Sequence, residues 1–266
     1  MPGIEELAGK TAVVTGGASG IGAGLCRRFA ARGMKLVVAD VDVDRANEMA
    51  EALRGAGGEA VAVRCDVSDR RSVEELADAT FDAFGRVDVV CNNAGVFLGG
   101  NMRDFTPGDW EWVMSVNLMG VVHGSSVFTK PLVEQGSGHI VNTASIGGFS
   151  VDPNCAPYTT SKFAVVGYSE ALRKDLEPDG VGVTMLCPGP VKTSIDTCDR
   201  LRPERAGESA VSSKAAIPVI ENGKHPDEVG DMVIQGIAEN ATYVFTHPEW
   251  GVFFEPRIEE IRRALG

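Results

Sequence analysis

The chain has 266 residues, of which 44% are hydrophobic and 23% charged, and its formal net charge is −12. This length and apolar content exclude a disordered chain and a small domain that needs disulfides or metals for stability. The acidic balance argues against a nucleic-acid-binding protein and against polybasic attachment to a membrane, since both require clustered positive charge.

The six cysteines, at positions 26, 65, 91, 155, 187 and 198, form no Cys-x-x-Cys pair, and no histidine stands at metal-ligand spacing from them. We therefore expect reduced thiols and no metal site. The first ten residues, MPGIEELAGK, lack the apolar run of a signal peptide, and the longest uncharged stretch, 112–129, contains Asn117 and His123. These features predict a cytoplasmic protein without a membrane partner.

Short, nearly continuous apolar runs alternate with longer helical patterns along the chain. The predicted strands are 11–15, 35–39, 60–65, 87–91, 139–143, 182–186 and 243–246, and the predicted helices are 20–32, 43–55, 70–84, 107–135, 157–177, 226–239 and 249–265. Continuously apolar strands are typical of a parallel sheet with helices on both faces. The pattern predicts a single α/β domain over residues 1–266, with a doubly wound parallel sheet of about seven strands.

Residues 193–224 interrupt this alternation with Lys, Arg, Pro, Ser and Gly in no periodic order. A long irregular segment in a compact domain is usually functional, and this one follows the end of a predicted strand. We expect a lid over a binding site that is mobile without ligand and ordered with it. The loop after Gly95 and the stretch 146–155 should complete the pocket, with an apolar lining from Ile146, Phe149, Val151 and Pro153.

Gly16, Gly20 and Gly22 form a G-x-x-x-G-x-G pattern between the first predicted strand and the first predicted helix. A tight packing turn would leave a similar pattern. The position at the first strand–helix junction favours a dinucleotide site, where glycines let a phosphate approach the helix N-terminus.

Asp40 ends the second predicted strand, eighteen residues after Gly22. In this topology that position faces the adenosine ribose, where a carboxylate accepts hydrogen bonds from both hydroxyls. A helix cap or a loop aspartate is the alternative interpretation. Because the carboxylate would repel the 2′-phosphate of NADP, the sequence predicts NAD. The third and fourth strands end in Asp66-Val67 and in Asn92-Asn93-Ala94-Gly95, which suit close passage of a cofactor.

Tyr158 and Lys162 are four residues apart on the predicted helix 157–177, so they share one face, and Ser145 ends the fifth predicted strand. A Tyr-x-x-x-Lys pair alone is usually a pair of surface side chains. An ammonium about 4 Å from a phenol contributes about 4 kcal/mol at an effective dielectric near 20. That is enough to lower the tyrosine pKa from about 10 by about 2–3 units, as a base at neutral pH requires.

These features stand in one order: T-G-x-x-x-G-x-G at 15–22, N-N-A-G at 92–95, Asn117, Ser145, Y-x-x-x-K at 158–162, and Pro188-Gly189 through Thr193. Over essentially its whole length the chain resembles the single-domain branch of the short-chain dehydrogenase/reductase family. The resemblance implies a Rossmann-type fold. It also implies hydride transfer between a nicotinamide and a secondary alcohol or its ketone, without a metal.

The resemblance further implies the roles of individual residues. Asn117, Ser145, Tyr158 and Lys162 would be the catalytic tetrad, with Tyr158 as general acid/base and Asn117 anchoring a water that relays protons from Lys162. The cofactor would be bound by Gly16, Ser19, Gly20, Ile21, Gly22, Asp40, Asp66, Val67, Asn93, Ala94, Gly95, Tyr158, Lys162, Pro188, Gly189, Val191 and Thr193. Asp66 and Val67 would flank the adenine, while Val191 and Thr193 would hold the nicotinamide carboxamide.

Residues 194–204 and 247–250 resemble family members that oxidise bulky aromatic or terpenoid secondary alcohols. An NADPH-dependent ketone reductase and a catalytically idle nucleotide-binding protein stay open as alternatives. Asp40 disfavours the first, and the complete tetrad disfavours the second. Cys155, three residues before Tyr158, is a candidate lining residue or a bystander. Relatives imply a homo-oligomer, a tetramer or a dimer, formed through helices 107–135 and 157–177.

Overall fold

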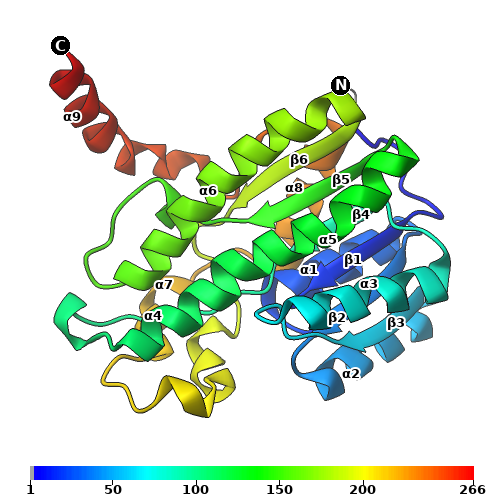
Figure 1. The fold of residues 1–266 in the computed structure, drawn as a ribbon, viewed down its shortest axis with the longest axis horizontal. Helices are drawn as coiled ribbons and strands as arrows, with labels where there is room; N and C mark the ends of the chain where they lie inside the picture. The colour runs from blue at the N-terminus through cyan, green and yellow to red at the C-terminus, as the bar shows by residue number, and fades with distance from the viewer. Residues whose placement is uncertain (1–2) are drawn as a thin grey trace.

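A computed structural model describes residues 3–266. Within this part of the chain, seven parallel strands form one sheet in the order β3-β2-β1-β4-β5-β6-β7 (Figure 1). The strands are β1 (Thr11–Thr15), β2 (Lys35–Asp40), β3 (Glu59–Arg64), β4 (Val89–Asn92), β5 (Gly138–Thr143), β6 (Val181–Cys187) and β7 (Tyr243–Phe245). The predicted doubly wound fold is confirmed, and each strand bound lies within two residues of its prediction.

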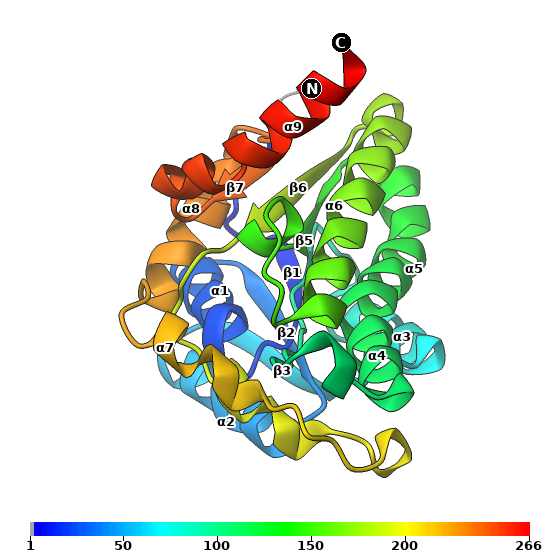
Figure 2. The same cartoon turned by 90° about the vertical axis from the view of Figure 1, so that its left-hand side faces the viewer.

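Helices cover both faces of the sheet, as Figure 2 shows. They are α1 (Gly20–Ala31), α2 (Val43–Gly55), α3 (Arg70–Phe84), α4 (Pro107–Met114), α5 (Gly120–Gln135), α6 (Ala156–Leu176), α7 (Ile217–Ile220), α8 (Pro226–Ala238) and α9 (Glu255–Leu265). Helices α1, α2 and α8 pack on one face, and α3, α5 and α6 pack on the other.

Alternate residues of each apolar strand point into the two layers of the core, one on each face of the sheet. Val13 and Val37 belong to the core layer with α3 and α5, whereas Val14 and Val38 belong to the layer with α1 and α8. All four side chains are fully buried. Because successive strand residues point to opposite faces, a strand covered on both sides must be apolar throughout. This explains why the strands are so easily recognised in the sequence.

The predicted helix 107–135 is not continuous. Thr106 caps the first part, α4, because its side chain accepts from the backbone N–H of Asp109 in a reciprocal capping box. A π-helical turn, Ser115–Met119, then separates α4 from α5. A π turn holds extra residues compared with a regular helical turn, and such turns occur frequently at functional sites. Asn117 lies in this turn and is fully buried.

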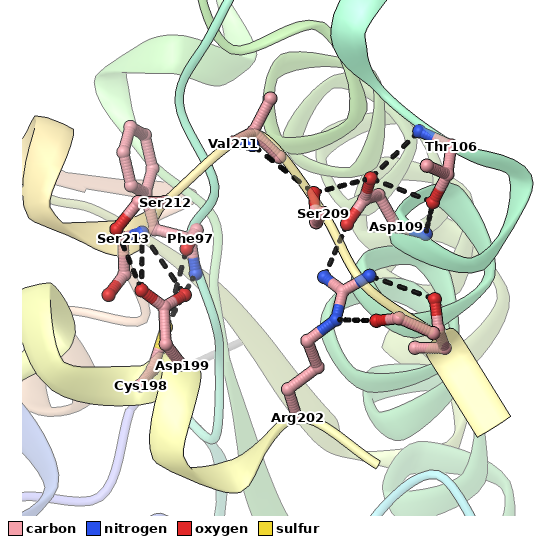
Figure 3. A network of polar contacts seen from close by, with 12 residues as sticks. Phe97, Thr106, Asp109, Cys198, Asp199, Arg202, Ser209, Val211, Ser212 and Ser213 are labelled. Carbon is pink, nitrogen blue, oxygen red and sulfur yellow. Dashed lines mark hydrogen bonds and ion pairs between the residues drawn. The ribbon is translucent and has the colours of Figure 1, made fainter. Parts of the chain in front are cut away.

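Residues 193–224 fold into short helices at the carboxyl edge of the sheet. These are η5 (Ile195–Leu201), η6 (Glu204–Ala206), η7 (Ser213–Ala216) and α7. Polar side chains hold them in place (Figure 3). Buried Asp109 of α4 accepts hydrogen bonds from Arg202 and Ser209, and Asp199 accepts from the Ser212 hydroxyl at 2.8 Å. Cys198, Ala206 and Val211 of the segment also pack in a buried apolar cluster with Trp112 of α4. The segment shows no periodicity because these apolar residues and the polar contacts come from short, separate helices rather than from one helix face.

The predicted helix 249–265 is divided into η8 (Pro248–Phe253) and α9. Both views show α9 extending away from the body of the molecule (Figures 1 and 2). Along residues 3–266, no helix has the length and apolar character needed to cross a membrane.

Candidate active site

A cavity of about 850 Å³ opens at the carboxyl ends of β1, β4 and β5. The order of the sheet changes direction between β1 and β4, which is where ligands bind in open α/β sheets. Of the residues predicted to act in catalysis or cofactor binding, those lining the cavity are Gly16, Ser19, Gly20, Ile21, Asp40, Asp66, Val67, Asn93, Ala94, Gly95, Ser145, Tyr158, Lys162, Pro188, Gly189, Val191 and Thr193. Gly22 and Asn117 lie behind this surface.

In the turn between β1 and α1, the glycine positions leave no space for a Cβ atom. Gly16 and Gly20 have φ angles of +63° and +51°, which favour glycine. A Cβ atom on Gly16 would lie 2.9 Å from the Cα of Ala94, and one on Gly22 would lie 2.0 Å from the carbonyl oxygen of Gly16. The backbone therefore comes close to the cavity at the N-terminus of α1, an arrangement that fits the phosphates of a dinucleotide.

Thr15 joins this turn to the segment after β4. Its hydroxyl accepts from the backbone N–H of Asn93 at 2.9 Å and of Ala94 at 3.2 Å. The Asn93 amide in turn donates to the Thr15 carbonyl at 3.0 Å. The two segments predicted to line a cofactor site are thus bound directly to each other.

Asp40 lies beside the glycine turn. One carboxylate oxygen accepts from the Ala18 N–H at 3.1 Å, and the other accepts from the Asp42 N–H at 3.0 Å. Burial raises the pKa of Asp40, and these two hydrogen bonds partly oppose the rise. The capping residue of α2 is Asp42, so the alternative interpretation of Asp40 as a helix cap is wrong.

Local hydrogen bonds and close packing hold other predicted cofactor residues in place. Asp66 accepts from the Ser68 hydroxyl at 2.7 Å, and Val67 packs against Gly120 of α5, where an added Cβ would lie 2.7 Å from its side chain. Gly189 donates to the Thr246 hydroxyl at 2.9 Å. These contacts hold the cavity wall on both sides of the sheet.

Lys162 of α6 reaches the cavity from inside the core. It is 4% exposed, and its ammonium donates to the Thr143 carbonyl at the end of β5 at 2.8 Å. Burial lowers the pKa of Lys162 to about 8. Its Nζ atom lies 5.6 Å from the centre of the Tyr158 ring.

Tyr158 lies one turn before Lys162, and its pKa differs from the predicted one. Burial raises the pKa of Tyr158 to about 12, although a hydrogen bond with Ser145 opposes the rise. The predicted lowering of the Tyr158 pKa is therefore wrong for the protein alone, because desolvation of the phenol is the largest effect.

Ser145 projects into the cavity from the end of β5. Its hydroxyl accepts from the Gly147 N–H at 3.0 Å and donates to the Pro188 carbonyl at 3.4 Å. The first contact holds the side chain in one orientation. The longer second contact leaves the hydroxyl proton available for a substrate oxygen.

Asn117 supports the site from behind. Its amide oxygen accepts from the Val96 N–H at 2.8 Å, and its amide nitrogen donates to the Val96 carbonyl at 2.9 Å and to the Ser161 hydroxyl at 3.1 Å. Gly95 lies between Asn117 and Lys162, since its Cβ would be 3.4 Å from the Asn117 oxygen and 3.7 Å from the Lys162 nitrogen. The side chain of Asn117 thus fixes the segment after β4.

Large apolar side chains line part of the cavity. They come from several parts of the chain: Phe97, Trp112, Ile146, Leu201, Val219, Ile220 and Trp250. The ring of Phe97 meets Tyr158 edge-on, with centroids 5.0 Å apart. Ile146 was predicted, whereas Phe97 and Trp112 were missed. The only sequence signal for Phe97 is that an aromatic residue follows N-N-A-G by two positions.

The prediction for Phe149, Val151 and Pro153 is wrong, because none of them lines the cavity. Phe149 turns away and packs against Phe254 with ring centroids 5.3 Å apart, and Val151 is 68% exposed. The polar residues between them, among them Ser150 and Asp152, face the cavity instead.

Cys155 lines the cavity but has no sign of activation. Its thiol lies 3.3 Å from the Thr159 hydroxyl, and burial raises its pKa. A reactive cysteine needs a lowered pKa. Cys155 is therefore a lining residue with a protonated thiol.

Known proteins match this chain in sequence and in fold. The family model for short chain dehydrogenases matches residues 10–203. The chain is 35% identical to the 1-deoxy-11-beta-hydroxypentalenate dehydrogenase of Streptomyces avermitilis, covering 98% of this chain and 93% of that protein. It is 32% identical to the C alpha-dehydrogenase of a Sphingobium species, covering 92% and 83%.

A solved structure matches the fold over nearly the whole chain. A short chain dehydrogenase/reductase from Burkholderia phymatum, in complex with NAD, superposes with a TM-score of 0.94 at 40% identity, covering 98% of this chain and 97% of that one. The chain belongs to the short-chain dehydrogenase/reductase family, and the class of protein is an oxidoreductase.

Proposed function

We propose that this protein is an NAD-dependent dehydrogenase that transfers hydride between a bulky secondary alcohol, or its ketone, and the nicotinamide. One observation carries the proposal: Ser145, Tyr158 and Lys162 face the same cavity as the glycine turn and Asp40. An idle nucleotide-binding protein would not need this set of side chains, so the alternative of a catalytically inactive protein is disfavoured.

In the proposed reaction, the Ser145 hydroxyl donates to the substrate oxygen and the Tyr158 oxygen takes the hydroxyl proton. A bound oxidised nicotinamide would accept the hydride and would add positive charge to the cavity. Moving the Tyr158 pKa from about 12 to about 8 corresponds to about 5 kcal/mol. Lys162 is already in place in the protein alone, so the positive charge of the bound cofactor would have to supply most of this difference; one such charge about 4 Å away contributes about 4 kcal/mol. Lys162 and Asn117 would then pass the proton outward through a bound water.

The preference for NAD rests on Asp40. Its carboxylate oxygens each hold one backbone N–H and retain lone pairs for the ribose hydroxyls. The 2′-phosphate of NADP would meet like charge at this position. The family member from Burkholderia phymatum, which was solved with NAD, supports the same choice.

A bulky apolar substrate is supported by the wall of Phe97, Trp112 and Trp250. Relatives named for a pentalenate and for a C alpha-dehydrogenation fit this class. We propose that residues 193–224 act as the lid over this substrate, since twelve of the cavity-lining residues come from them.

We also propose that the enzyme is cytoplasmic and forms a homo-oligomer, a dimer or a tetramer. All six cysteines are buried free thiols, which suits a reducing compartment. Helices α4, α5 and α6 are the proposed contact surfaces.

The decisive experiment is a panel of secondary alcohols, from small aliphatic to bulky aromatic and terpenoid, assayed with NAD and NADP in parallel. We expect turnover of the bulky members and a preference for NAD of about a hundredfold in kcat/KM. Asp40→Ser should reduce that preference at least tenfold, chiefly by improving NADP. Equal kcat/KM for the two cofactors in the wild type would place Asp40 away from the ribose. Turnover of none of these alcohols would contradict the proposed substrate class.

A further inference from the structure

The loop that follows β4 is held on its main chain by residues that come about a hundred positions later. The Cys198 thiol of η5 accepts from the Phe97 N–H, with the sulfur 3.4 Å from the nitrogen, and donates to the Phe97 carbonyl at 3.3 Å. The backbone of Gly99 pairs with that of Ser212 in both directions, at 3.1 and 3.2 Å. The segment 193–224 therefore fixes this loop at two points.

The Cys198 thiol is suited to this double contact. Its residue is 5% exposed, and burial raises the pKa of the thiol to about 11, so it keeps its proton near neutral pH and can donate. A thiol is a weak donor and a weak acceptor. Here one sulfur nevertheless serves two backbone groups, and its removal leaves the Phe97 N–H and carbonyl without a partner within residues 3–266.

The ring of Phe97 covers one edge of Tyr158. The two ring centroids are 5.0 Å apart and the ring planes are inclined by 70°. The same ring lies close to Gly99, where an added Cβ would be 3.2 Å from the ring atom Cε1 and 2.5 Å from the Cβ of Ala215 in η7. This packing leaves the ring little freedom while the main chain of the loop stays in place.

The charged and titratable groups around Tyr158 come from other elements than this loop. The Lys162 Nζ atom of α6 lies 5.6 Å from the centre of the Tyr158 ring, and the Cys155 thiol, which also acts on Tyr158, has its pKa raised by burial. Asp152 lines the same cavity from the stretch after β5. Phe97 carries no charge, so its effect on the phenol is to exclude water.

We propose that Cys198 and Phe97 are positioning residues for Tyr158: the thiol holds the Phe97 main chain, and the Phe97 ring keeps water from the edge of the phenol. The inference rests on the proposed role of Tyr158 as the general base. An apolar cover disfavours the phenolate in the protein alone. The low dielectric that it creates also strengthens the attraction of any positive charge that enters the cavity. The cover thus keeps the base protonated until the oxidised cofactor is bound.

The test is the pKa of Tyr158 in the protein without cofactor. Ionisation is measured from the ultraviolet absorbance of the phenolate directly after a rapid pH jump, before the chain unfolds. Each protein is compared with the same protein carrying Tyr158→Phe, so that the difference excludes Tyr168 and Tyr243, the other two of the three tyrosines.

Phe97→Ala should lower the pKa of Tyr158 from about 12 to about 11, because water then reaches the phenol edge. Cys198→Ala should lower it about half as far, because the ring is loosened but not removed. Cys198→Ser is the matched control. Serine and alanine leave nearly the same space in the core, but the serine hydroxyl keeps a donor and an acceptor, so this variant should titrate as the wild type does.

An unchanged pKa of Tyr158 in Phe97→Ala, or equal values in Cys198→Ala and Cys198→Ser, would overturn the positioning role. The titration uses neither alcohol nor cofactor. The proposed function has a separate test, since it fails if Tyr158→Phe keeps the kcat of the wild type.

Discussion

The cofactor side of the cavity and the segment 193–224 face each other, but different forces hold them. On the cofactor side, parallel strands and close backbone contacts fix every element, as at Gly22, whose Cβ would lie 2.0 Å from a carbonyl oxygen. In 193–224, side-chain contacts hold the segment: Arg202 and Ser209 donate to Asp109, and Ser212 donates to Asp199 (Figure 3). Cys198, Ala206 and Val211 add a small apolar cluster with Trp112.

The difference has a consequence for how each side responds to change. A strand register is supported by many backbone hydrogen bonds, so one substitution leaves it in place. A segment that depends on a few buried polar contacts can lose its position when one contact is removed. We therefore expect chemistry to be lost by single changes on the sheet side without a change of shape, and shape to be lost by single changes on the other side.

The largest effect is expected from Tyr158→Phe, which removes one oxygen from the rigid side. A general base contributes on the order of 10²–10⁴ in rate, so kcat should fall on the order of a thousandfold. The dissociation constant of NADH, measured by fluorescence titration, should stay within about twofold of the wild type, because the ring and its edge contact with Phe97 are kept. More than a few per cent of wild-type kcat in the variant would show that another group is the base.

The next largest effect is expected on the segment 193–224, from Asp109→Asn in α4. This change keeps the capping group of α4 but leaves Arg202, which is 13% exposed, without a counter-charge. Breaking a buried pair costs about 3–5 kcal/mol. Limited proteolysis followed by mass spectrometry should show faster cleavage within 193–224.

Glu111→Gln is the matched control for that experiment. Glu111 pairs with Arg205 at 3.9 Å, and both side chains are more than 60% exposed, so the cleavage rate should change little. Equal cleavage of Asp109→Asn and wild type would mean that apolar contacts, rather than this ion pair, hold the segment.

A third effect concerns the free energy of unfolding, to which the buried Lys162 on the sheet side contributes. Lys162 has a folded pKa of about 8 against an ordinary 10.5, so below pH 8 the fold carries the cost of a buried ammonium. Lys162→Met should be more stable than the wild type at pH 7 by about 2 kcal/mol, after allowing for the lost bond to Thr143.

The sign of its pH dependence follows from linkage. Between pH 8 and 10.5 the unfolded chain binds more protons than the folded chain, so the stability of the wild type rises with pH. The variant lacks this rise, and the gap should close over that range in urea unfolding curves. A gap that stays constant from pH 7 to 10.5 would contradict the lowered pKa.

The smallest effect is expected at an ion pair that joins the two sides, Arg200 with Asp42. Arg200 of η5 donates to Asp42 at 2.9 Å and, like Asp40, lines the cavity. The pair is half exposed, so Arg200→Ala should raise the release rate of NADH by only about two- to fivefold in stopped-flow fluorescence. Asp42→Asn, which keeps the cap of α2, should do the same, and Arg205→Ala should not. Unchanged release in both Arg200→Ala and Asp42→Asn would show that the pair does not restrain the cofactor.

The parts of the molecule that the sequence predicts well are those set by local pattern. Apolar runs locate the strands, and the glycine turn, Ser145 and the Tyr158–Lys162 pair follow from their positions at strand ends and on one helix face. Arg200 and Asp42 are 158 residues apart, and no local pattern joins them. The pKa of Tyr158 depends on burial by Phe97 and other distant residues, so spacing alone gives the wrong direction.

The π turn at Ser115–Met119 gives the two halves of one long helix different orientations about their common axis. Each residue of a regular helix advances the rotation by about 100°, so deleting one residue here would turn α4 by that angle relative to α5. Trp112 would leave the cavity while Phe128 kept its place against the sheet. The turn therefore acts as a phase shift: it sets which side chains of α4 face the cavity independently of those that α5 buries against the sheet.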